Sequence, residues 1–167
     1  MNAIEESARE LVECYRRAGK TCATAESCTG GGAGAAITAV PGASEVFAGG
    51  VISYSNAVKR KILGVPGEIL EVFGAVSSQC AAKMAEGARK LLGVDAAVSI
   101  TGIAGPGGGS DQKPVGTVWF GLATADGTGA ECCLFEGDRA AVRAQSVEKA
   151  LSLLKNCSFP AKSNQRT

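Results

Sequence analysis

The chain has 167 residues, which suit a single domain, and its 17 Lys and Arg residues nearly balance its 16 Asp and Glu residues. The net charge of +1 gives no broad field toward nucleic acid or an anionic membrane, so we expect neither as a partner. The absence of histidine excludes a Ser-His-Asp triad, a Cys-His dyad and every His-ligated zinc site, so proton transfer must use Lys, Tyr, Asp, Glu or water.

The N-terminal half predicts helices alternating with buried strands. Its first six residues lack the basic and apolar regions of a secretory signal, so we expect a cytoplasmic protein. Apolar residues at helical spacing predict a helix over 3–18, capped by Asn2 with Glu5 and ended by Gly19. The next predicted elements are a buried strand over 21–25, a glycine turn, a helix over 33–40, a strand over 46–54, and short helices over 58–63 and 66–73.

The C-terminal half predicts a long helix, a glycine-rich loop and a hairpin. Its elements are a helix capped by Ser77 or Ser78 and running to Leu92, a buried strand over 96–100, a loop over 101–114, strands over 115–124 and 131–135 around a turn at 126–129, and a helix over 139–155. Strands separated by helices early and joined by a hairpin late predict one three-layer α/β/α domain with a mixed sheet. We expect residues 1–156 to form this domain and residues 157–167 a flexible tail.

Ser27 lies in a glycine-rich turn between the predicted strand and helix, in the run Ala25-Glu26-Ser27-Cys28-Thr29-Gly30-Gly31. Backbone N–H groups in such a turn can stabilise an oxyanion, which favours Ser27 as an acyl-transfer nucleophile. A simple helix cap is an equally good interpretation of the serine. The neighbouring Cys28 is a rival nucleophile, although a buried structural cysteine explains it as well. The seven cysteines include no Cys-x-x-Cys pair, so neither a disulfide framework nor a zinc ribbon is indicated.

Without histidine, Ser27 would need a lysine that burial or nearby cations keep neutral. Lys59 is one candidate, five residues after Tyr54 and followed by Arg60 and Lys61, although a solvated basic helix face explains the same run.

Two further segments favour ligand binding. The loop over 101–114 is long and contains five glycines, and Thr101 stands at the end of a buried strand, where ligands bind in open α/β sheets. Arg139 follows the predicted helix cap Asp138, and its charge opposes the helix dipole there. That placement suits a phosphate ligand, while a surface ion pair is the alternative.

Taken together, these segments resemble one known family across residues 8 to 155. The motifs that carry the resemblance are Thr24-Ala25-Glu26-Ser27-Cys28-Thr29-Gly30-Gly31, Gly50-Val51-Ile52-Ser53-Tyr54-Ser55-Asn56, Leu63-Gly64-Val65, Gly74-Ala75-Val76-Ser77, Ile100-Thr101-Gly102-Ile103-Ala104-Gly105-Pro106-Gly107-Gly108, Lys113-Pro114-Val115-Gly116-Thr117-Val118-Trp119 and Gly137-Asp138-Arg139. The family is the CinA C-terminal domain family, known also as nicotinamide-nucleotide amidase, here in its stand-alone form.

The resemblance implies hydrolysis of the carboxamide of nicotinamide mononucleotide to nicotinic acid mononucleotide and ammonia, in pyridine-nucleotide salvage. It implies a serine nucleophile with a lysine base, no metal, no cofactor and a homo-oligomer. The family positions correspond to catalytic residues Ser27 and Lys59 and to substrate-binding residues Tyr54, Thr101 and Arg139, with Thr29, Gly30 and Gly31 in the turn.

Three alternatives stay open at this point. Lys61 competes with Lys59 as the base, and Arg143 competes with Arg139 as the phosphate ligand. The chain could also be a non-catalytic nucleotide-binding or regulatory module of the same fold, which would bind the nucleotide without releasing ammonia.

Overall fold

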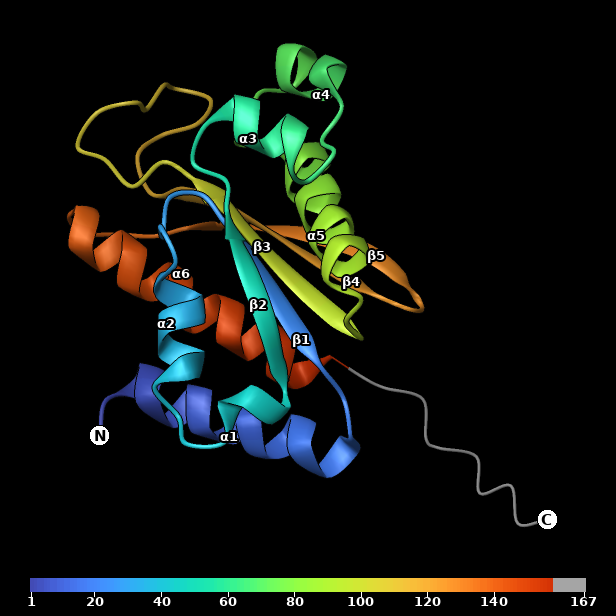
Figure 1. Cartoon of the computed structure of the whole chain (residues 1–167). Coiled ribbons are helices and arrows are strands. Elements are labelled where there is room, and N and C mark those ends of the chain that lie inside the picture. The colour runs from blue at the N-terminus through green and yellow to red at the C-terminus, as the bar shows by residue number, and fades with distance from the viewer. Residues whose placement is uncertain (158–167) are drawn as a thin grey trace.

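The computed structural model describes residues 1–157 as a mixed five-stranded sheet with helices on both faces (Figure 1). In chain order the elements are α1 (Ala3–Ala18), β1 (Cys22–Glu26), α2 (Gly32–Thr38), the 3-10 helix η1 (Ala43–Glu45), β2 (Phe47–Ile52), α3 (Asn56–Lys61), α4 (Gly67–Val72), α5 (Ser78–Leu92), β3 (Ala96–Gly102), β4 (Thr117–Thr124), β5 (Gly127–Leu134) and α6 (Arg139–Asn156). This architecture confirms the predicted α/β/α domain with a mixed sheet. The predicted flexible tail lies, beyond Cys157, outside the described residues.

The sheet brings the ends of three strands to one edge. Its strand order is β2-β1-β3-β4-β5, in which β1 pairs in parallel with β2 and β3, while β4 runs antiparallel to both of its neighbours, β3 and β5. The last residue of β1, Glu26, is level with Ile52 of β2 and Ile100 of β3. The loops that leave these three strands therefore begin side by side, at the upper end of the sheet in Figure 1.

Side chains alternate between two cores because successive residues of a strand point to opposite faces. Cys22 and Val98 join the core formed with α1, α2 and α6, whereas their neighbours Ala23 and Ala97 join the core beneath α5. Figure 1 shows α1, α2 and α6 on one face of the sheet and α5 on the other. Both faces of β1 and β3 are therefore covered, which explains why these strands are buried along almost their whole length and consist mostly of small residues.

The predicted helix caps are confirmed. Asn2 accepts from the Glu5 N–H in a reciprocal capping box, and Gly19 ends α1 in the left-handed conformation. Ser77 caps α5 by accepting from the Cys80 N–H, and Asp138 caps α6 by accepting from the Ala141 N–H. These local hydrogen bonds fix where α5 and α6 begin, close to the loops at the carboxyl ends of β1 and β3.

The predicted turn at 126–129 is wrong. Strand β5 already starts at Gly127, which pairs with Thr124, so the turn is the two-residue link Ala125-Asp126. The Thr124 hydroxyl accepts from the Asp126 N–H inside this turn. Pairing of residues 127–129 with β4 adds hydrogen bonds between the strands that a four-residue turn would leave unmade. The strands therefore pair as far as a two-residue turn allows.

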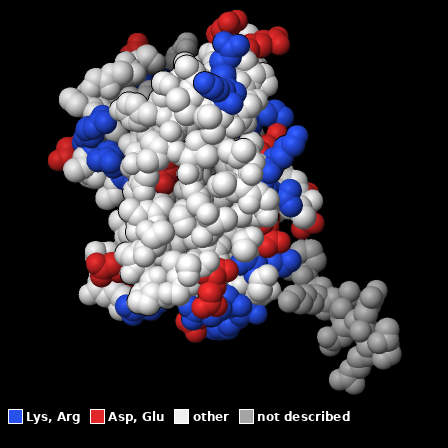
Figure 2. Space-filling view, in the orientation of Figure 1, with Lys and Arg blue, Asp and Glu red and all other residues white. Residues whose placement is uncertain are grey.

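Charged side chains form no large patch on the face drawn in Figure 2. On the face drawn in Figure 2, Lys, Arg, Asp and Glu lie mainly at the rim, and the centre is almost uncharged. No helix within the described part of the chain is long and apolar enough to cross a membrane.

The helix α5 carries a glycine at the place where the chain leaving α3 crosses it. A methyl group at Gly87 would overlap the backbone carbonyl of Leu63. Helix propensity alone predicts that Gly87→Ala raises the free energy of unfolding, by about 1 kcal/mol. We expect the overlap to reverse the sign and lower it by about 1–3 kcal/mol, measured by urea unfolding.

The matched control is Gly129→Ala, because a methyl group on that glycine of β5 would meet no atom within 4 Å. We expect its unfolding curve to stay within about 0.5 kcal/mol of wild type. A Gly87→Ala protein as stable as this control would show that the contact between α5 and Leu63 can accommodate a methyl group.

Candidate active site

A cavity of about 230 Å³ opens at the carboxyl ends of β1 and β3, between α3, the loop after β3 and the start of α6. Its lining residues are Ser27, Cys28, Tyr54, Asn56, Lys59, Ala75, Val76, Thr101, Gly102, Ala104 and Arg139. The sequence segments that line it lie far apart along the chain, and the parallel arrangement of β1, β2 and β3 is what brings them to one edge.

Ser27 and Lys59 are in direct contact in this cavity. The Nζ of Lys59 lies 3.0 Å from the Oγ of Ser27, 2.8 Å from the carbonyl oxygen of Ser53 and 3.2 Å from that of Tyr54. Lys59 is 1% exposed and Ser27 is 8% exposed. Ser55 caps α3, and Lys59 on the first turn of this helix reaches the carbonyls of Ser53 and Tyr54, which precede it.

Lys61, the alternative base, does not line this cavity. It lies on the exposed side of α3, where it borders a separate surface hollow with Arg60, Pro66 and Gly67. Two residues along a helix correspond to a rotation of about 200°, so only one of the two lysines can face Ser27. The geometry therefore brings Lys59, and not Lys61, to the serine.

Burial lowers the pKa of the Lys59 amine below its ordinary value of 10.5, because the charged form loses its hydration. The nearby thiols of Cys80 and Cys28 act weakly in the opposite direction. Arg60, which sequence reasoning offered as a cation that would lower this pKa, is exposed. Desolvation, rather than charge repulsion, is thus the cause of the shift.

Cys28, the rival nucleophile, is disfavoured by its surroundings. Burial raises the pKa of its thiol to about 11, and the opposing effects of its backbone hydrogen bond and of Arg143 are smaller. The side chain therefore stays a protonated thiol near neutral pH, and a thiol is a poor nucleophile compared with a thiolate.

The turn residues Thr29, Gly30 and Gly31 follow Ser27 directly and are not among the residues that line the cavity. The Gly30 N–H donates to the Ser27 carbonyl, and Gly30 and Gly31 both have positive φ angles, 59° and 99°, which only glycine adopts freely. These glycines allow the sharp change of direction from β1 into α2. The hydroxyl of Thr29 points inward and donates to Glu26 at 2.7 Å.

Sequence reasoning missed the role of Glu26, which is 1% exposed. Its carboxyl oxygens accept from the Ala33 N–H at 2.9 Å, from the Gly34 N–H at 3.0 Å, and from the hydroxyls of Thr24 and Thr29. The start of α2 is therefore already satisfied by a side chain of the protein and is not open to an anion. An acidic residue just before a predicted helix start was the available signal.

The two arginines on the first turns of α6 have different surroundings. Arg139 lines the cavity and donates to the Gly105 carbonyl at 2.9 Å and to the Tyr54 hydroxyl at 3.4 Å. Arg143, one turn later, donates to the carbonyls of Cys28 and Thr29. Only Arg139 among the two therefore faces the space in front of Ser27.

Tyr54 and Thr101 complete the wall. Tyr54 is 62% exposed at the mouth of the cavity, while Thr101 is 1% exposed and its hydroxyl donates to the Ala75 carbonyl at 2.9 Å. That hydrogen bond ties the end of β3 to the segment before α5.

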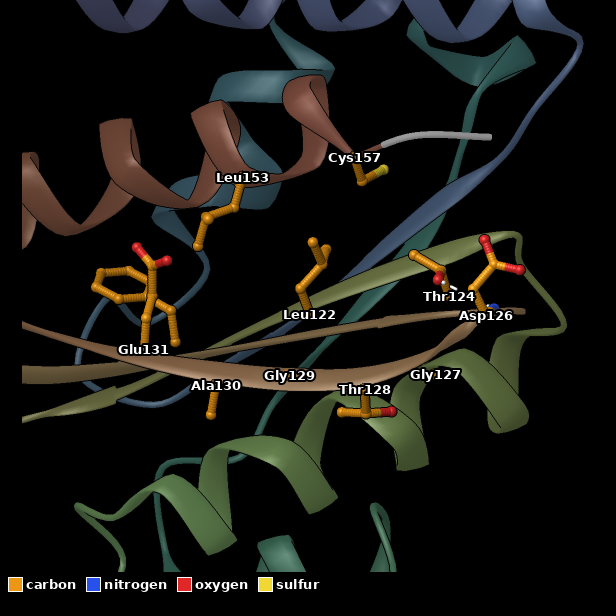
Figure 3. Close-up of a pocket in the computed structure, with 11 residues that line it drawn as sticks. Leu122, Thr124, Asp126, Gly127, Thr128, Gly129, Ala130, Glu131, Leu153 and Cys157 are labelled. Atoms are coloured by element: carbon orange, nitrogen blue, oxygen red, sulfur yellow. Dashed lines mark hydrogen bonds between the residues drawn. The ribbon is translucent and has the colours of Figure 1, made fainter. Parts of the chain in front are cut away.

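A larger cavity, of about 610 Å³, lies elsewhere, between the β4–β5 hairpin and the end of α6 (Figure 3). In Figure 3, Leu122 and Leu153 point toward one another across it, and Cys157 closes one end. It contains none of the predicted site residues and no nucleophile paired with a base. Among the described residues, no group of three or more Cys, Asp or Glu side chains is arranged to hold a metal ion.

The lowered pKa of Lys59 makes stability depend on pH. Between this lowered value and 10.5 the unfolded chain binds a proton at residue 59 that the folded protein does not, so rising pH stabilises the fold across that window. We expect the free energy of unfolding of wild type, relative to Lys59→Met, to rise with pH below 10.5 in urea titrations.

Lys61→Met is the control, since it removes an exposed lysine from the same helix. Its free energy of unfolding should depend on pH in the same way as that of wild type. The same pH dependence in Lys59→Met would mean that the buried amine keeps its ordinary pKa.

Known proteins are similar to this chain in sequence. A profile of the CinA C-terminal domain matches residues 4–158. The chain is 56% identical over 148 residues to the CinA-like protein of Parasynechococcus marenigrum (strain WH8102), covering 87% of this chain and 35% of that protein. It is 51% identical over 151 residues to the CinA-like protein of Synechococcus sp. (strain RCC307), covering 87% and 35%. The chain thus spans about a third of the length of these relatives.

Solved structures share its fold. The crystal structure of the competence/damage inducible protein CihA from Agrobacterium tumefaciens matches with a TM-score of 0.89 and 41% identity, covering 92% of this chain and 94% of that one. The competence damage-inducible protein A (ComA) from Klebsiella pneumoniae subsp. pneumoniae MGH 78578 matches with a TM-score of 0.89 and 38% identity, covering 92% and 96%. On the profile, the sequences and the fold together, the chain belongs to the CinA C-terminal domain family.

Proposed function

We propose that this protein hydrolyses the carboxamide of nicotinamide mononucleotide to nicotinic acid mononucleotide and ammonia, with Ser27 as the nucleophile and Lys59 as its base. The observation that carries the proposal is the contact of 3.0 Å between a nearly buried lysine and a serine that faces a small cavity. A serine hydroxyl within hydrogen-bond reach of a desolvated amine is the arrangement that activates a nucleophile without histidine.

Burial favours the neutral amine of Lys59, and in the proposed mechanism the lone pair of that amine is directed at the Ser27 hydroxyl. A neutral amine has two N–H groups and one lone pair. The carbonyl oxygens of Ser53 and Tyr54 can only accept hydrogen bonds, so they take the two N–H groups. The lone pair is then left for the Ser27 hydroxyl, which donates its proton. The two carbonyls thus orient the base, as a carboxylate orients the imidazole in a Ser-His-Asp triad.

The proposed reaction has two steps. Lys59 takes the hydroxyl proton while Ser27 Oγ bonds to the carboxamide carbon, and backbone N–H groups of the turn after Ser27 stabilise the oxyanion. The protonated lysine then gives its proton to the leaving nitrogen, and ammonia departs. Water, activated by the same amine, attacks the acyl-enzyme and releases the carboxylate product.

The cavity and its arginine suit a small phosphorylated substrate. Its volume of about 230 Å³ is below the range of roughly 300–1,000 Å³ typical of drug-sized ligands, which favours a mononucleotide over a dinucleotide. Arg139 forms no ion pair with a carboxylate of residues 1–157. Its guanidinium, at the mouth of the cavity beside Tyr54, is therefore available to a phosphate.

Removal of the nucleophile or the base tests the chemistry. Ser27→Ala should lower ammonia release from nicotinamide mononucleotide by at least about 10³-fold, and Lys59→Ala by about 10²- to 10⁴-fold. In the wild type, kcat should rise with pH as Lys59 loses its proton, with a midpoint below 10.5 because burial lowers the pKa of Lys59.

Lys61→Ala is the matched control and should keep the wild-type rate and pH profile, with circular dichroism confirming the fold of each variant. Near-wild-type turnover by Ser27→Ala would refute the serine mechanism. Binding of the nucleotide by the wild type with no ammonia released would instead identify a non-catalytic nucleotide-binding module.

Arg139 has its own test, in which the substrate itself supplies the control. Arg139→Gln should raise KM for nicotinamide mononucleotide by about 10- to 100-fold, because a charge-assisted hydrogen bond to phosphate is lost. For nicotinamide riboside, which lacks the phosphate, wild type and variant should differ little. An equal effect on both substrates in steady-state kinetics would mean that Arg139 does not bind the phosphate.

A further inference from the structure

The turn after Ser27 leaves three backbone donors without a partner among residues 1–157. The Ser27 N–H donates to the Ile100 carbonyl at 2.9 Å, the Gly30 N–H to the Ser27 carbonyl at 3.1 Å, and the Gly32 N–H to the Thr29 carbonyl at 3.0 Å. Glu26 takes the next two N–H groups, at the start of α2. The N–H groups of Cys28, Thr29 and Gly31 donate to no atom of residues 1–157. Those of Cys28 and Thr29 are the nearest to Ser27 and remain for an oxyanion.

These two N–H groups are consecutive within one tight turn. The hydrogen bond from Gly30 to the Ser27 carbonyl closes a four-residue turn with Cys28 and Thr29 at its centre. Successive N–H groups in a turn form a concave anion-binding arrangement, and Cys28 lines the cavity directly. In acyl transfer by serine, the N–H of the residue after the nucleophile is a common oxyanion donor.

Arg143 holds the opposite side of the same turn. Its Nε donates to the Cys28 carbonyl at 3.1 Å, and its terminal nitrogen donates to the Thr29 carbonyl at 3.2 Å. The peptide between Cys28 and Thr29 is planar and trans, so its N–H points away from its carbonyl. By fixing the carbonyl, the guanidinium fixes the direction of the Thr29 N–H. A cation on the carbonyl oxygen also polarises the peptide and strengthens its N–H as a donor.

We propose that Arg143 is a positioning residue for the oxyanion site formed by the Cys28 and Thr29 N–H groups. This inference deepens the proposed function and rests on Ser27 being the nucleophile. It divides the two arginines of α6 by role. Arg139 lines the cavity and binds the substrate, whereas Arg143 donates to the carbonyls of the turn after Ser27 and acts through the backbone.

The division predicts opposite kinetic signatures. Arg143→Gln should lower kcat by about 10- to 100-fold, somewhat less than the loss of an oxyanion donor itself, with KM within about twofold of wild type. The kcat of Arg143→Lys should lie between those of wild type and Arg143→Gln, because an ammonium supplies one point charge where the guanidinium supplies two directed N–H groups. Arg139→Gln should instead act mainly on KM.

A second measurement does not depend on the substrate. An alkyl fluorophosphonate reacts when Ser27 Oγ bonds to phosphorus, the P–F bond breaks, fluoride leaves and Lys59 takes the hydroxyl proton; its phosphoryl oxygen then occupies the oxyanion site. Labelling is followed by intact mass, with Ser27→Ala as the blank. We expect Arg143→Gln to slow labelling by about 10- to 100-fold and Arg143→Lys by less.

Lys149→Gln is the matched control, because it removes a cation from the same helix that pairs with Glu131, away from the cavity. It should label and turn over at the wild-type rate. Wild-type labelling and kcat in both Arg143 variants would overturn the inference, and so would a parallel rise in KM as large as the fall in kcat. If Arg143→Gln fails to fold, Arg143→Lys decides the same question.

The outcomes separate this inference from the proposed function. A wild type that labels at Ser27 but releases no ammonia from nicotinamide mononucleotide would refute the proposed substrate, and the labelling rates of the Arg143 variants would still test the oxyanion site. A wild type that does not label at Ser27 would refute both.

Discussion

The candidate site depends on one buried lysine that has no acidic partner among the described residues. Lys59 is 1% exposed, and its three hydrogen-bond partners are two backbone carbonyls and the Ser27 hydroxyl, none of them charged. A carboxylate in the same place would have stabilised the ammonium and held the proton on it. Neutral acceptors satisfy the N–H groups without cancelling the cost of burying charge, and this is how the surroundings favour a free base.

The sheet makes the contact between this base and the serine possible. Ser27 follows β1, and the segment that carries Lys59 follows the neighbouring parallel strand β2. The Ser53 N–H donates to the Glu26 carbonyl at 2.8 Å, so the residue after β2 is joined to the residue before the serine. The carbonyls that orient the amine and the Ser27 hydroxyl that contacts it are thus both attached to the paired ends of β1 and β2.

What the sequence could reveal was mostly local. Caps such as Asn2, Ser77 and Asp138 are recognisable because each bonds to a residue three positions away, and the strands are recognisable by composition. The choice between Lys59 and Lys61 was not local, since it depends on which side of a short helix faces Ser27. The β5 register was misplaced because glycine signals a turn and is equally tolerated at a strand end. Glu26 and Arg143 bond across 7 to 8 and 114 to 115 positions, and no sequence period reports such contacts.

The elements that break local rules are the ones gathered around Ser27. A buried lysine without an acidic partner, a glutamate buried beneath a helix start, and two glycines at positive φ each carry a cost in stability. Each cost is met by specific hydrogen bonds: the carbonyls of Ser53 and Tyr54 for the amine, and four donors for Glu26. A purely structural turn between β1 and α2 would need none of these groups. Their concentration at one edge of an otherwise regular sheet is therefore better explained by the chemistry of Ser27 than by the needs of the fold.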